Sequence, residues 1–144
     1  MWKQAICILL LVGLNGFAEP RTRESVRRQG NRITLGRDHG CGILHNGTVQ
    51  CWGQNLFGQI GDGTLNDRLF PTTVSGLGNV VSIAAGASHS CALLAGGTVR
   101  CWGRNNNGQL GDGTTTNRPS PVQVSGLTSV RAISAGEFFT CAIL

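Results

Sequence analysis

Residues 91–114 read CALLAGGTVRCWGRNNNGQLGDGT, and fifty residues earlier, positions 41–64 read CGILHNGTVQCWGQNLFGQIGDGT. The two stretches align without a gap. A third copy begins at Ile133 and brings Cys141 to the place of Cys91. Self-similarity at a fixed period of this length indicates a repeat architecture in which each period is one structural unit. We therefore treat the chain as a tandem repeat.

Each period has the pattern of four short β-strands, which are apolar or alternating runs bounded by glycine-rich turns. In the second copy we expect them at Val80–Ala85, Ser90–Leu94, Thr98–Trp102 and Pro121–Ser125. A polar loop rich in Asn, Gly, Asp and Thr, residues 105–118, separates the third strand from the fourth. One four-stranded unit cannot bury both of its faces, so successive units should stack. The predicted fold class is all-β.

The repeats occupy residues 33–82 and 83–132, followed by a truncated third repeat at 133–144. Residues 1–18 are predicted to be a signal peptide, because Lys3 precedes a ten-residue apolar run and the small Ala18 follows it. That run is too short for a helix to cross about 30 Å of hydrocarbon, so a membrane anchor is the weaker interpretation.

Positive charge gathers in residues 19–32, which contain five arginines and two glutamates. We expect a basic disordered linker there, with contact to an anionic partner as the alternative. The repeats themselves are almost neutral, and the prediction includes no nucleic-acid partner.

The cysteines of each repeat stand ten residues apart, on either side of a hairpin. If Leu94 lies opposite Thr98, then Cys91 lies opposite Cys101, at a spacing that a disulfide spans with little adjustment. We therefore predict two disulfides, Cys41–Cys51 and Cys91–Cys101. Disulfides persist in oxidising compartments, so the expected location is secreted, periplasmic or on the cell surface.

Cys141 is left over, because its expected partner would stand ten residues further on, past Leu144. The sequence is then a fragment or has an odd cysteine. The alternative use of the cysteines is a metal site in which His39 joins the first cysteine pair. The third copy has Phe139 in place of that histidine, so the repeated histidine is better explained as a hydrogen-bonded packing residue.

The frame Trp102-Gly103-Arg104-Asn105, followed by Gly108-Gln109-Leu110-Gly111-Asp112-Gly113, resembles the repeat of the regulator of chromosome condensation family. Residues 33–144 show this resemblance. It implies tandem four-stranded antiparallel blades of a seven-bladed β-propeller, with the tryptophan packed between blades. Two repeats and a stub cannot close such a ring, so the propeller is incomplete and further blades of the same chain, or other copies, would complete it. The paired cysteines are similar to those of exported bacterial members.

The predicted function is a non-catalytic secreted or cell-surface scaffold for protein–protein binding, with an inhibitor or an adhesion module as particular forms. The loops vary while the frames around them repeat, so the candidate contacts with a protein partner are Asn55, Leu56, Phe57, Arg68, Asn105, Asn106, Asn107 and Arg118. The alternative, which the family resemblance implies, is a guanine-nucleotide exchange regulator of a small GTPase.

An enzyme is not expected. Only two acidic residues repeat, Asp62 and Asp112, and both precede a glycine in the pattern of a turn. No phosphate-binding or nucleophile motif occurs. The sequence therefore predicts no catalytic residue, no cofactor and no metal.

Overall fold

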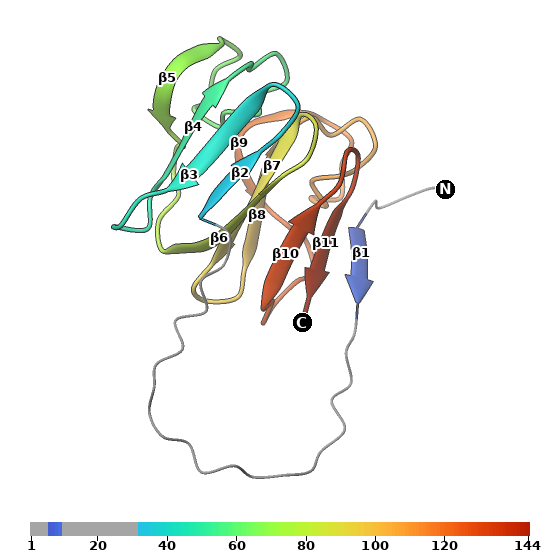
Figure 1. Cartoon of the computed structure of the whole chain (residues 1–144). Coiled ribbons are helices and arrows are strands. Elements are labelled where there is room, and N and C mark those ends of the chain that lie inside the picture. The colour runs from blue at the N-terminus through green and yellow to red at the C-terminus, as the bar shows by residue number, and fades with distance from the viewer. Residues whose placement is uncertain (1–5, 10–31) are drawn as a thin grey trace, which may run out of the picture.

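The computed structural model describes residues 6–9 and 32–144, which form strands connected by turns and loops. Two four-stranded antiparallel sheets follow each other along the chain. The first contains β2 (Ile33–Leu35), β3 (His39–Ile43), β4 (Val49–Gly53) and β5 (Arg68–Thr73). The second contains β6 (Val80–Ala85), β7 (His89–Leu94), β8 (Val99–Gly103) and β9 (Arg118–Gln123). β10 (Ala132–Ala135) and β11 (Thr140–Ile143) begin a third sheet, and Figure 1 shows the three sheets stacked as consecutive blades.

The predicted hairpin register is confirmed. Cys91 pairs with Cys101, Ala92 with Arg100 and Leu93 with Val99, and the first sheet repeats this register. The turn between the two strands uses Gly97 at a φ of 77°, a conformation that favours glycine.

The predicted start of the fourth strand, at Pro121, was wrong. β9 begins at Arg118 and contains both Pro119 and Pro121. Proline lacks a backbone N–H and is disfavoured inside a sheet, but β9 lies at the edge of its sheet and pairs only with β8. An edge strand can place a proline where no ladder hydrogen bond is needed.

β6, the first strand of the second sheet, begins at Val80. The second sheet therefore starts before the predicted repeat boundary between residues 82 and 83. The hairpin turn of each sheet bonds to the segment that enters the next sheet. The amide of Val80 donates to the carbonyl of Gly47 at 3.0 Å, and the amide of Val130 donates to that of Gly97 at the same distance.

β11 pairs antiparallel with β10 and parallel with β1 (Ile6–Leu9), and this register sets Cys7 opposite Cys141. β1 falls within the segment predicted to be a signal peptide. The rest of that segment and residues 19–31 of the predicted basic linker lie outside the described residues, so both assignments stay predictions. Within the part of the chain that the structure describes, no helix has the length and apolar character to cross a membrane.

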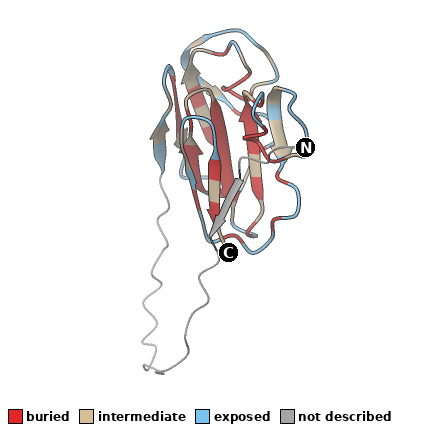
Figure 2. Ribbon diagram, turned by 90° about the vertical axis from the view of Figure 1, so that its right-hand side faces the viewer, coloured by how far each residue is buried: buried red, intermediate tan, exposed pale blue. Residues whose placement is uncertain are grey.

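The apolar core lies between the sheets, as Figure 2 shows by its buried layer. One cluster joins Cys41, Cys51 and Ile60 of the first repeat to Ile83 and Trp102 of the second, and another cluster joins the second repeat to the third in the same way. Each sheet is thus stabilised by its neighbour, because a face left open would expose this apolar surface to water.

Trp102 occupies the centre of the first of these interfaces and is fully buried. Its indole N–H donates to the carbonyl of Gln59 at 2.9 Å. Gly61 makes room for the ring, since a Cβ there would lie 2.6 Å from the indole nitrogen, and its φ of 79° also requires glycine. The tryptophan packing that the family resemblance implied is confirmed at this position. Trp52, the equivalent residue, is partly exposed because no described strand covers its side of the first sheet.

The two predicted cysteine pairs are at disulfide distance and are joined, with 4.1 Å between the Cα atoms in each. All four cysteines are fully buried. We expect that replacing Cys91 and Cys101 together by alanine lowers the free energy of unfolding by about 2–3 kcal/mol, because the closed loop restricts the unfolded chain. Urea titration followed by circular dichroism measures the change. A double variant as stable as the parent would contradict the prediction.

Candidate protein-interaction face

One end of the sheets carries most of the irregular chain. We call this end the loop face. It consists of the turns at residues 36–38, 86–88 and 136–139 and the loops at residues 54–67 and 104–117. The other end carries the hairpin turns at residues 44–48 and 95–98.

Two of the predicted contact residues, Asn55 and Asn105, lie inside their loops with no exposed surface. The Asn105 amide nitrogen donates to the carbonyls of Thr114 and Thr116 at 3.0 and 3.1 Å, and its amide oxygen accepts from the backbone of Leu110 at 3.0 Å. Asn55 makes the same bonds in the first repeat. Their assignment as partner contacts is therefore corrected: these asparagines hold the loops together from inside.

Asn105 and Asn106 provide a direct test of this correction. We expect Asn105→Ala to lower the free energy of unfolding by about 1–3 kcal/mol, because three backbone groups, of which the Leu110 amide is buried, lose their partner. Asn106→Ala, at an exposed neighbouring position, should change it by less than about 0.5 kcal/mol. Thermal unfolding of the two variants side by side gives the comparison. Equal effects would mean that the loop does not depend on Asn105.

Arg68 and Arg118 are also occupied within their own loops. Arg118 Nε donates to Asp112 at 2.8 Å, and Arg68 Nε donates to Asp62 at 2.6 Å. Burial raises the pKa of the Asp62 carboxyl, but the amide and hydroxyl of Thr64 and the guanidinium of Arg68 outweigh it, so the pKa is lowered overall. These ion pairs fasten the base of each loop, and the arginines remain only partly exposed.

The rest of the predicted set faces outward to different degrees. Leu56 has 62% of its surface exposed, and Asn106 and Asn107 are exposed as well. Phe57 is half-buried because Arg104 lies over its ring, with 5.0 Å between the guanidinium carbon and the ring centroid. Phe138, from the third repeat, approaches the same guanidinium at 5.9 Å.

This cluster of Phe57, Arg104 and Phe138 draws one residue from each repeat. Sequence reasoning found Phe57 but missed the other two. The available signal was that Arg104 stands where the first copy has Gln54, and Phe138 where the second has Ser88. The cluster is therefore absent from the repeated frame and specific to this part of the chain.

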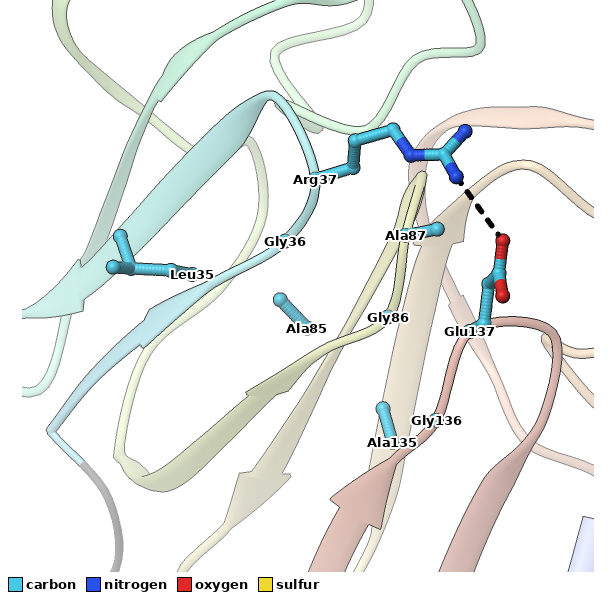
Figure 3. Close-up of a pocket in the computed structure, with 9 residues that line it drawn as sticks. All are labelled: Leu35, Gly36, Arg37, Ala85, Gly86, Ala87, Ala135, Gly136 and Glu137. Atoms are coloured by element: carbon cyan, nitrogen blue, oxygen red, sulfur yellow. Dashed lines mark hydrogen bonds and ion pairs between the residues drawn. The ribbon is translucent and has the colours of Figure 1, made fainter.

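Beside the cluster, the three short turns enclose an open groove of about 380 Å³. Its lining comes from equivalent positions of the three repeats, residues 35–37, 85–87 and 135–137. Figure 3 shows Arg37 and Glu137 reaching toward each other past Ala87, with 3.3 Å between charged atoms. Backbone bonds tie the turns beneath them, from Arg37 to Ala87 at 3.1 Å and from Ala87 to Glu137 at 3.2 Å. The ion pair is well exposed, so it contributes little to stability. The backbone of the three turns forms the floor of the groove.

Beneath the groove, the same hydrogen-bond arrangement of a histidine, a hydroxyl and a backbone carbonyl occurs between each pair of successive sheets. The Ser90 hydroxyl donates to the Gln59 carbonyl at 3.2 Å, so at 2.9 Å it must accept from His39 Nε2. The Nε2 of His39 therefore carries a proton. His89 and Thr140 repeat the arrangement between the second and third sheets.

Burial lowers the pKa of both imidazoles to about 4, although Asp38 partly opposes this at His39. The two histidines therefore pack as neutral, hydrogen-bonded residues. The cysteines near them are joined to each other and cannot serve as thiolate ligands. Within residues 6–9 and 32–144, no three His, Cys, Asp or Glu side chains are placed to hold a metal ion.

Comparison with known proteins points to one family. Models of the regulator of chromosome condensation (RCC1) repeat match residues 46–93 and 96–143, and a related model of the same repeat matches 32–59 and 80–109. No curated protein sequence matches the chain significantly.

Among solved structures, human WBSCR16 is 28% identical, with a TM-score of 0.67 over 73% of this chain and 28% of its own length. Yeast RCC1 (Prp20), in its complex with Kap60, is 28% identical, with a TM-score of 0.61 over 72% of this chain and 25% of its own. Prp20p from Saccharomyces cerevisiae, solved with an account of its binding properties to Gsp1p and histones, is 18% identical, with a TM-score of 0.68 over 75% and 29%. The chain thus spans between a quarter and a third of the length of these proteins.

Proposed function

Because the chain belongs to the regulator of chromosome condensation (RCC1) repeat family, we propose that it is a non-catalytic scaffold that binds a protein partner through the loop face. The repeated frame supplies rigidity, since Asn105, Asp112 and Trp102 are all committed to internal bonds. The residues that differ between repeats are the ones that face outward. Rigid frames with variable loops are a common arrangement for binding sites.

The observation that carries the proposal is the cluster of Phe57, Arg104 and Phe138 on this face. Exposed apolar surface accompanies it, with Leu56 at 62% and Phe138 at 40% exposed. Aromatic residues and arginine are enriched at protein interfaces, where they dominate the binding energy. The cluster brings together side chains of three repeats, but it is not part of the apolar core that holds the sheets together.

Site-specific photocrosslinking tests the proposal. A photoreactive amino acid replaces Asn106 on the loop face, and in a matched variant it replaces Asn46 in a hairpin turn at the other end. Both side chains are exposed, so either variant should fold. In the native setting we expect a discrete protein adduct from position 106 and none from position 46. Adducts from position 46 alone, or from neither position, would overturn the proposal.

We also propose that the chain acts outside the reducing cytosol. Two cystine pairs and the amino-terminal pattern of residues 1–18 support this location. Amino-terminal sequencing of the mature protein should begin at Glu19. A mature chain that retains Met1 and is recovered from the cytosol with these four cysteines as free thiols would contradict it.

Nucleotide exchange on a small GTPase is the alternative that the family suggests. A GTPase loaded with a fluorescent guanine nucleotide separates the two functions. We expect the release rate to stay unchanged when this chain is added, and accelerated release would favour the exchange function.

A further inference from the structure

Arg104 has a charge that the described part of the molecule leaves without a counter-ion. The ion pairs on the loop face are Arg37–Glu137, Arg68–Asp62 and Arg118–Asp112, and within residues 32–144 none includes Arg104. Its Nε is buried and has no hydrogen-bond partner among the described residues. A guanidinium has five donors, and a carboxylate is its best-fitting partner because it accepts two parallel bonds from the planar fork.

The surroundings of Arg104 restrict what can approach it. Phe57 and Phe138 lie within 5.0 and 5.9 Å of the guanidinium carbon and hold the group by cation–π attraction. Holding the side chain in place lowers the entropy lost when it binds a ligand. The exposed parts of Leu56 and Phe138 add apolar surface beside the charge. The site therefore suits a carboxylate with apolar neighbours better than a bare anion.

The position of the site on the loop face restricts the ligand further. Phe57, Arg104 and Phe138 come from three consecutive sheets, so exposed loop residues lie on both sides of the charge. A bound segment can continue in both directions across the face. A side-chain carboxylate within an extended segment fits this arrangement, whereas a chain terminus would use only half of it.

We propose that Arg104, held between Phe57 and Phe138, is the anchoring residue for a glutamate or aspartate side chain that is flanked by apolar residues on the partner protein. The inference rests on the proposed binding function and adds the chemistry of the partner. We call these three residues the anchor seat. The residues at the equivalent positions of the other repeats supply substitutions that test it.

Each member of the anchor seat has a counterpart that the same fold already accommodates. Gln54 stands in the place of Arg104, Asn107 in the place of Phe57, and Ser88 in the place of Phe138. Arg104→Gln therefore removes the charge by a substitution that another repeat tolerates. Arg131→Gln is the matched control, because Arg131 is exposed, precedes β10 at the opposite end and makes no ion pair within the described residues.

The probe is an array of immobilised nine-residue peptides, each with an amidated carboxyl end and a central glutamate flanked by varied apolar residues. A second array has glutamine at the centre. We expect the oxidised full chain to bind the best glutamate peptides about tenfold more tightly than their glutamine partners, as for a hydrogen-bonded charge pair. Arg104→Gln should abolish this preference, Arg104→Lys should restore only part of it, and Arg131→Gln should leave it unchanged.

The inference is overturned if the parent chain shows no preference for glutamate, or if Arg104→Gln retains it. Peptides with a free carboxyl end and no internal acid provide a further arm. Binding to these alone would replace the side-chain carboxylate by a chain terminus and overturn the proposal as stated. The crosslinking at position 106 does not depend on these results, so the scaffold can hold while the anchor seat fails, and each failure is recognisable.

Discussion

Replacing Trp102 by alanine is expected to lower the free energy of unfolding by about 3–5 kcal/mol, the range for a large buried aromatic residue. The ring fills the interface between the first two sheets, has no exposed surface and bonds to the Gln59 carbonyl. Its removal leaves a cavity and takes from the Gln59 carbonyl one of its two hydrogen bonds, so that only the bond from the Ser90 hydroxyl remains. Urea titration followed by far-ultraviolet circular dichroism gives the value.

Trp52 is the matched control, because it holds the equivalent position in the first sheet but is partly exposed. We expect Trp52→Ala to cost less than half as much, since less apolar surface was buried there. A loss of equal size at both positions would show that the contact between sheets is not what makes Trp102 important.

Lowering the pH from about 7 to about 4 should destabilise the chain by on the order of 5 kcal/mol through His39 and His89 together. Burial lowers the pKa of each imidazole to about 4 from the ordinary 6.5, so the unfolded chain takes up protons first as the pH falls. Their contribution to stability is complete above pH 6.5, falls between pH 6.5 and 4, and changes no further below that range. Urea titrations at several pH values measure the slope.

The double variant His39→Phe/His89→Phe isolates this effect, with the residue that stands at the equivalent position of the third repeat, Phe139. Its stability should be nearly constant over the same pH range. Asp62 and Asp112 do not confound the comparison, because both are present in parent and variant, and since the pKa of each is lowered from 3.8, their contribution begins to fall only near pH 4. The same slope in parent and variant would refute the role of the two histidines.

Local features of the sequence were sufficient for the hairpins. The ten-residue cysteine spacing and the glycine turn fix the register of β7 and β8, so Cys91 could be placed opposite Cys101. The start of β9 could not be predicted in this way. Pro119 interrupts a strand only if the ladder needs its N–H, and whether it does depends on β9 being an edge.

The loops were harder to predict because burial there depends on tertiary contacts. Asn105 looked like an exposed loop residue, but its partners Thr114 and Thr116 lie further along the loop and fold back over it. The useful signal was its recurrence as Asn55, since residues that repeat belong to the frame. Arg104 differs from Gln54 at the equivalent position, so it does not belong to the repeated frame. Its neighbours Phe57 and Phe138 come close to it only when three sheets stack.

We propose that the repeated residues hold the fold and that residues which differ between repeats, above all the anchor seat, bind the partner. The triple variant Phe57→Asn, Arg104→Gln, Phe138→Ser gives every member of the anchor seat its counterpart from another repeat. The decisive measurement is the yield of the protein adduct formed from position 106 in this variant. We predict that the adduct is lost while the free energy of unfolding changes by no more than about 1–2 kcal/mol. An undiminished adduct from the folded triple variant would contradict the claim that the partner binds through the anchor seat.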